Sequence, residues 1–121
     1  MDIFKETLPE ERAVVKIPLG EYRIKIKDLN YVDISGRNLC YHLTNGKTVD
    51  SQCIRTSFAK EVGNLVNNKH LHFIAPSLLI NLSHIKAMYK DYLILDNDET
   101  VYFPRRAYEK LHTAWKEYYT V

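Results

Sequence analysis

The sequence has few of the residues that enzyme, export and membrane motifs require. Its four glycines are isolated from one another, so they cannot form a phosphate-binding P-loop or a dinucleotide-binding fingerprint. Its two cysteines, Cys40 and Cys53, show no C-x-x-C spacing, and we expect free thiols rather than a disulfide framework. No apolar run approaches the ~20 residues of a membrane-spanning helix, and the first residues show no secretory signal. These absences predict a cytoplasmic protein without membrane contact.

Charge of one sign is not in large excess either. The 121 residues include 17 Lys and Arg against 15 Asp and Glu, a net charge of +2. This excess is too small to diagnose nucleic-acid binding by itself. The length fits one domain with a substantial core. We expect a turn-prone, acidic N-terminal tail, residues 1–12, followed by a single domain, residues 13–121.

Alternation of apolar and polar residues predicts several short strands. In residues 22–27, Tyr22, Ile24 and Ile26 alternate with basic residues, as in a half-buried strand with one wet face. The pair Asn45-Gly46 is typical of a tight hairpin turn. The other segments that we expect to be extended are residues 13–17, 31–34, 39–43, 48–50, 71–80, 87–95 and 100–103.

Helical spacing of apolar residues occurs in two places. Phe58, Val62, Leu65 and Val66 recur on one stripe of a helix that we expect from about residue 57 to residue 67. From Arg105 onward, aromatic and apolar residues return at helical spacing, after a proline that suits a helix start. They are Tyr108, Leu111, Trp115 and Tyr118. The fold class is therefore mainly β with two helices, that is, α+β.

No catalytic or metal-binding constellation is evident in the sequence. Asp91, Asp96, Asp98 and Glu99 cluster near a turn, but no partner base stands at a telling spacing. His70 and His72 would point to one face of a strand, yet two ligands do not complete a metal site. We therefore expect no enzymatic activity, no cofactor and no metal.

Five segments, in order and spacing, are similar to a known family, the first of them formed by two adjoining stretches. Residues 77–85 read Ser-Leu-Leu-Ile-Asn-Leu-Ser-His-Ile, and a hairpin-like stretch, residues 88–95, follows at once. The further segments are residues 28–33, 43–47, 57–65 and 103–108. This order resembles the LytTR DNA-binding domain, the effector part of many bacterial response regulators, over roughly residues 14 to 111. The resemblance implies an array of short antiparallel sheets whose loops enter successive major grooves of a bent duplex.

The resemblance also implies which side chains contact DNA. Arg106 falls on a position that contacts DNA in the family, and Arg37 falls on an early loop that reaches a groove. Arginine can read guanine with two parallel hydrogen bonds or hold a phosphate. The candidate DNA-binding residues are Arg37, Asn38, Lys47, Lys86, Arg105 and Arg106. For the lysines, which lie in or near turns, simple solvation is the alternative interpretation.

One segment departs from the family pattern. Residues 73–76, Phe-Ile-Ala-Pro, stand where the family usually carries an Arg-Ile-His-Arg type run. Ala75 and Pro76 therefore supply no base-reading side chain, and Pro76 supplies no backbone N–H. At ~1 to 3 kcal/mol for each lost contact, two losses remove much of a typical specificity margin of ~4 to 10 kcal/mol.

Two functional hypotheses follow. The first is sequence-selective binding to double-stranded DNA, as promoter repeats, by the effector domain of a bacterial two-component response regulator or a stand-alone transcription factor. A receiver domain does not fit within this length, and an upstream receiver domain or a sensor kinase, together with a homodimer, are the expected protein partners. The second is a degenerate domain that binds another regulator or a sensor, with residues 73–76 turned to apolar recognition.

Overall fold

The computed structural model describes residues 11–63, 65 and 68–120 of the chain. Within these residues the chain is built mainly from short strands. The strands are β1 (Arg12–Ile17), β2 (Gly20–Lys25), β3 (Leu29–Ser35), β4 (Asn38–Leu43), β5 (Thr48–Cys53), β6 (Leu71–Ala75), β7 (Leu78–Asn81), β8 (Ile85–Met88), β9 (Tyr92–Leu95) and β10 (Thr100–Tyr102). The helices are α2 (Phe58–Glu61) and α3 (Tyr108–Tyr119), with 3-10 turns η1 (Ile26–Asp28), η2 (Leu82–His84) and η3 (Arg105–Ala107).

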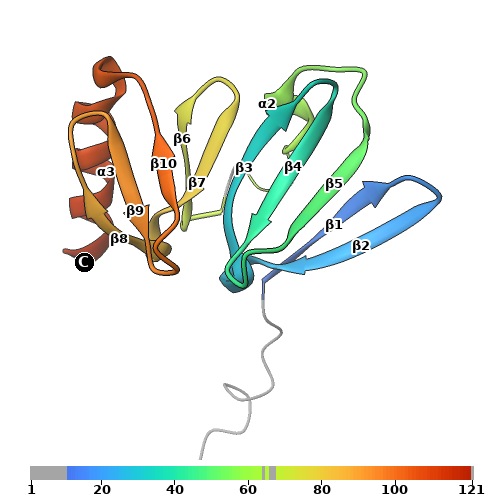
Figure 1. The fold of residues 1–121 in the computed structure, drawn as a ribbon, viewed down its shortest axis with the longest axis horizontal. Helices are drawn as coiled ribbons and strands as arrows, with labels where there is room; N and C mark the ends of the chain where they lie inside the picture. Colours follow the sequence, from blue (N-terminus) through green and yellow to red (C-terminus); the bar gives the residue numbers. More distant parts are fainter. Residues whose placement is uncertain (1–10, 64, 66–67, 121) are drawn as a thin grey trace, which may run out of the picture.

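The strands form three antiparallel sheets. Their orders are β1-β2, β5-β4-β3-β7-β6 and β10-β9-β8. Figure 1 shows the five-stranded sheet in the middle, between the β1–β2 hairpin and the three-stranded sheet, with α3 beyond the latter. This is the mainly β fold with two helices that the sequence predicted.

Each face of the five-stranded sheet builds its own hydrophobic core. Successive residues of a strand point to opposite faces, so Val32 and Leu79 join the core under β1, β2 and α2. Their neighbours Tyr31 and Ile80 join the core formed with the three-stranded sheet and α3. Strands buried on both faces are apolar without alternation. This explains why the motif around residues 78–80 reads as a continuous apolar run.

Asn81, in the middle of the same motif, ties the two cores together. It is 1% exposed, and its Nδ2 donates to the carbonyl oxygens of Ile26, at 3.1 Å, and Leu29, at 2.9 Å. Its Oδ1 accepts from the Ser83 backbone N–H at 3.0 Å and from the Ser83 hydroxyl at 2.6 Å. One buried amide thus provides hydrogen-bond partners for backbone groups just before and at the start of β3 and just before β8.

The turn predicted from Asn45-Gly46 is confirmed. Gly46 has a φ of 85°, the left-handed region that glycine adopts without steric cost. The Asn45 side chain accepts from the Lys47 backbone N–H at 2.9 Å, and the Leu43 N–H donates to the Lys47 carbonyl at 2.9 Å. This turn fixes the register of β4 against β5 from the His42–Thr48 pair to the Cys40–Asp50 pair, after which an irregularity shifts the pairing by one residue.

Two of the predicted strands are in fact hairpins. Residues 71–80 form β6 and β7, which turn at Pro76 and Ser77, and residues 87–95 span the turn between β8 and β9. Proline lacks the N–H that a continuous ladder needs, so the chain turns there. The predicted strand at residues 22–27 ends earlier, because Ile26 opens η1.

The helix predicted for residues 57–67 is shorter than expected. Ser57 caps it as predicted, with its hydroxyl accepting from the Lys60 N–H, but α2 spans only Phe58–Glu61. Val62 and Leu65 continue as turns and are still buried in the first core. Val66 and Asn67 lie outside the described residues, as does most of the predicted tail. Arg12, the last residue of that tail, is already part of β1, where it stands opposite Lys25 of β2.

The C-terminal helix agrees with its prediction. Pro104 caps η3, and α3 follows directly. Leu111, Trp115 and Tyr118 pack into the second core. No helix in the described part of the chain is long and apolar enough to cross a membrane.

His72 makes the stability of this packing sensitive to acid. Burial, with Lys110 of α3 nearby, holds the pKa of His72 below its ordinary value of 6.5. The unfolded chain therefore takes up a proton more readily, and stability is full above about pH 6.5 and falls as the pH drops below it. We expect His72→Gln to lose less unfolding free energy than the wild type between about pH 7.5 and about pH 5.5, by at most ~1 kcal/mol because the ring is partly exposed. Urea unfolding at both pH values measures this difference, and equal losses in the two proteins would contradict it.

Candidate nucleic-acid interface

Several connections of the fold lie at one end of the strands. The register pairs Ser35 with Asn38, Asn38 with Cys53 and Ala75 with Leu78, which places the β3–β4 turn, the β5–α2 connection and the β6–β7 turn at the same end of the five-stranded sheet. In Figure 1 the β8–β9 turn and η3 lie at this upper end as well. We call this end the arginine edge, defined by Arg37, Arg55, Arg105 and Arg106.

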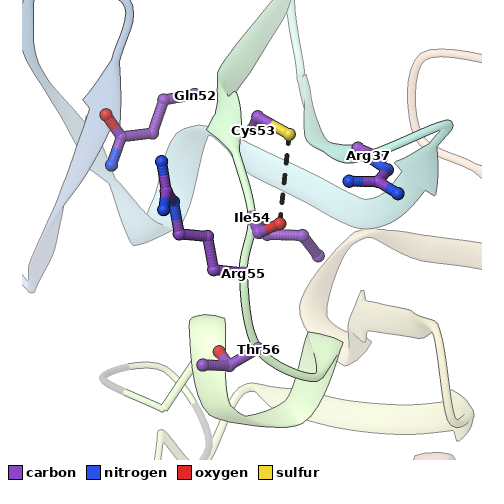
Figure 2. A pocket seen from close by; sticks show the side chains of 6 residues that line it. All are labelled: Arg37, Gln52, Cys53, Ile54, Arg55 and Thr56. Carbon is purple, nitrogen blue, oxygen red and sulfur yellow. Dashed lines mark hydrogen bonds between the residues drawn. The ribbon is translucent and has the colours of Figure 1, made fainter.

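Arg37 and Arg55 flank one open hollow in this edge. The Ile54 N–H donates to the Arg37 carbonyl at 2.7 Å, which holds the end of β5 against the β3–β4 turn. Figure 2 shows the two guanidinium groups on opposite sides of the Cys53–Ile54 backbone. The hollow has a volume of about 890 Å³ and a mainly polar lining that includes Gln52 and Thr56. Two cations around one polar hollow suit an anionic group.

Arg105 and Arg106 lie in η3, just before α3. Both side chains are exposed. The 3-10 turn is held by Pro104, whose carbonyl accepts from the Ala107 N–H at 2.9 Å. Nearby, the Lys90 ammonium of the β8–β9 turn lies 4.5 Å from the centre of the Tyr108 ring. This half of the edge therefore presents cations from two neighbouring connections.

The four arginines of the edge have no charged side-chain partner among the residues that the structure describes. None of them forms an ion pair or a side-chain hydrogen bond with any residue that the structure describes. A guanidinium group without an internal carboxylate keeps its five donors for an outside partner. The arginine edge is therefore a positively charged surface rather than a network of structural salt bridges.

Asn38, another candidate contact residue, supports this edge from inside. Its Nδ2 donates to the Ser51 carbonyl at 2.7 Å, and the Leu39 N–H donates to the Ser51 hydroxyl at 2.9 Å. Both bonds join β4 to β5 directly beside the Arg37 turn. The structure thus gives the Asn38 amide an internal role in fixing the turn.

The two candidate lysines lie at the opposite end of the molecule. Lys47 is in the β4–β5 turn, which contacts the β9–β10 turn through the Asn97 Nδ2, 3.4 Å from the Thr44 carbonyl. Lys86 forms an ion pair with Asp98 of that turn. Figure 1 shows both turns at the lower end, away from the arginine edge. The structure therefore does not bring Lys47 and Lys86 together with Arg37, Arg105 and Arg106.

Arg55 was not among the residues predicted from the sequence. The sequence indicates Arg55 only indirectly, because the position of Arg55 depends on where β5 ends. The hairpin at Asn45-Gly46 sets a register that pairs Cys40 with Asp50, and an irregularity between Asn38 and Cys40 then shifts the pairing by one residue, so that Cys53 meets Asn38 and residue 55 comes beside the Arg37 turn. Counting along the hairpin would have paired Asn38 with Gln52, so the sequence alone does not fix this position.

The turn with the unusual sequence lies between the two pairs of arginines. Pro76 and Ser77 are exposed there and offer neither a base-reading amide nor a cation. Phe73 is partly buried and packs edge-on against Phe58, with ring centres 6.2 Å apart. The first core thus uses part of the Phe73 ring, and apolar recognition by residues 73–76 stays a prediction.

The three antiparallel sheets, with α3 packed beside the third, define a small β-rich α+β domain. Among solved structures, the fold is similar to one described as "LytTr DNA-binding domain of putative methyl-accepting/DNA response regulator" from Bacillus cereus, with a TM-score of 0.66. The match covers 88% of this chain and 97% of that chain, at 18% sequence identity. No protein-family model matches the chain, and no curated protein does so either. The protein has the LytTR fold that its motifs predicted.

Proposed function

We propose that this protein binds double-stranded DNA through the arginine edge, as the DNA-binding domain of a transcription regulator. The observation that carries the proposal is the set of four exposed arginines at one end of a LytTR fold, without internal ion pairs among the described residues. Phosphate contacts from such groups supply much of protein–DNA affinity. The hollow lined by Arg37 and Arg55 suits an anionic group, and η3 suits a second contact point.

Recognition of DNA by this edge relies more on backbone and shape than on base edges. The β6–β7 turn lies at this edge and carries Pro76 and Ser77, so the centre of the interface has no bidentate reader of a base. Arg37 and Arg106 remain as side chains able to read guanine O6 and N7. We infer modest sequence selectivity, set by those two arginines and by the deformability of the duplex.

The regulatory setting is inferred from the family resemblance. The domain acts as the output of a response regulator or as a stand-alone bacterial factor in the cytoplasm, on repeated promoter half-sites. A homodimer, an upstream receiver domain and a sensor kinase are the protein partners that this setting implies. No catalytic role is proposed for any residue.

The salt dependence of binding tests the proposed function. If four arginines neutralise phosphates, log affinity should fall linearly with log salt with a slope of about −3 to −4. Fluorescence anisotropy with a labelled duplex, at salt concentrations from about 50 to about 200 mM, measures the slope. Absence of binding at the lowest salt, or an affinity that salt does not change, would count against DNA as the ligand.

A further inference from the structure

A group of metal-ligating side chains lies on the half of the five-stranded sheet that the second core leaves open. Asp33 of β3 pairs with Cys40 of β4, and Tyr31 pairs with His42, so these four residues project from the same face. The possible ligand atoms of Asp33, Cys40 and His42 all lie within 4.8 Å of one another. Asp33 and Cys40 lie on the two strands that flank the Arg37 turn, four and three residues from Arg37. None of the three side chains is among the proposed DNA contacts.

The imidazole of this cluster is held firmly in place. His42 Nε2 lies 2.9 Å from Asp33 Oδ1, and His42 Nδ1 lies 3.8 Å from Glu99 Oε2. The ring stacks on Tyr31 at 3.9 Å between centres, and the Tyr31 hydroxyl donates to Glu99 at 2.7 Å. A carboxylate on the far nitrogen of a histidine is the usual outer partner of a metal-binding imidazole.

Cys40 is surrounded by carboxylates. It is half-buried and pairs across the sheet with Asp50 of β5. Burial, with Asp50 next in importance, raises the pKa of the Cys40 thiol to about 12. A thiol in such surroundings is a poor nucleophile, which argues against a redox role. The excess of negative charge around it is the setting that a divalent cation would balance.

We propose that Asp33, Cys40 and His42 form a binding site for Zn²⁺ or a cation of the same borderline-soft class. One oxygen, one sulfur and one nitrogen are a donor set that zinc accepts, with bonds of about 2.0 to 2.3 Å. Tetrahedral bonds of that length put the ligand atoms ~3.3 to 3.7 Å apart, which is within the 4.8 Å that contains the ligand atoms of this cluster. As the Zn–S bond forms, the thiol proton passes to solvent. Asp50 or a water completes the coordination, and Glu99 orients His42.

Cobalt titration of the 121-residue chain tests the site directly. Co²⁺ bound to a thiolate gives a charge-transfer absorption, and Cys40 and Cys53 are the only cysteines of the sequence. We expect the band at one equivalent of Co²⁺ in the wild type and in Cys53→Ser, its loss in Cys40→Ser, and its displacement by Zn²⁺. Glu99→Gln should weaken Co²⁺ affinity ~10-fold or more.

The outcomes separate a metal site from a structural ion pair. A band that is absent from the wild type at saturating Co²⁺, or that persists in Cys40→Ser, overturns the proposal. Should Cys40→Ser fail to fold, X-ray absorption of zinc-loaded Cys53→Ser decides, with one sulfur neighbour at ~2.3 Å expected and a shell of oxygen and nitrogen alone contradicting the site. Neither measurement depends on DNA, so its result tests the metal site independently of the proposed DNA binding.

Discussion

Replacing Arg37, Arg55, Arg105 and Arg106 together by alanine is expected to reduce affinity for duplex DNA by roughly 10³-fold. Each group supplies a phosphate or base contact of about 1 kcal/mol or more, and ~1.4 kcal/mol corresponds to a tenfold change in affinity. The structure describes no internal ion pair for these side chains, so their removal leaves no buried carboxylate unpaired. The fold should therefore persist while the interaction is lost, as anisotropy and circular dichroism together would show.

The opposite end of the molecule supplies the matched control. Lys47→Ala removes an exposed cation from the β4–β5 turn, and Lys86→Ala removes one that is already paired with Asp98. The double variant should keep its DNA affinity within about twofold at physiological salt, because exposed charges beyond a Debye length of ~8 Å are largely screened. A loss as large as that of the arginine variant would show that net charge, rather than the arginine edge, governs binding.

Asn81→Leu is expected to lower the free energy of unfolding by about 3 kcal/mol or more. The change keeps the volume of the side chain but removes its hydrogen bonds to Ile26, Leu29 and Ser83. The Leu29 carbonyl oxygen and the partly buried Ser83 N–H then lose the Asn81 amide as a partner, at about 1 to 3 kcal/mol for each unsatisfied group. The Ile26 carbonyl keeps its bond from the Leu29 N–H. Urea unfolding followed by circular dichroism measures the change.

An exposed asparagine provides the comparison for Asn81. Asn97 lies in the β9–β10 turn, where its Oδ1 accepts from the Glu99 N–H at 3.1 Å. Asn97→Leu should cost ~1 kcal/mol or less, since water replaces the lost bonds. Equal losses in the two variants would mean that Asn81 does not join the two cores in the way its contacts indicate.

The parts of the fold that the sequence predicted well are those set by local chemistry. Asn45-Gly46 favours a tight turn because glycine adopts the positive φ of residue 46 without steric cost. Pro104 suits the start of the final helical segment. The order of motifs around Asn81 predicted the LytTR fold, and the structure supplies the reason. The apolar run before Asn81 is buried on both faces of a sheet, and Asn81 itself bridges two cores.

The parts that were missed depend on contacts between distant residues. Val62 and Leu65 have helical spacing, yet they reach the first core from turns, so spacing alone overestimated α2. Arg55 became a candidate only when β5 was placed beside the Arg37 turn. Lys47 and Lys86 were grouped with the arginines by charge and loop position, although the antiparallel topology separates the two ends of the sheet.

The most direct test of the account is an NMR titration of the ¹⁵N-labelled protein with duplex DNA. Amide shifts are expected to concentrate at the arginine edge, in the β3–β4 turn, residues 53–57 and η3. The β4–β5 and β9–β10 turns at the other end should remain unchanged. Shifts centred on those two turns, or a spectrum that DNA leaves unaltered at low salt, would contradict the claim that the arginine edge binds DNA.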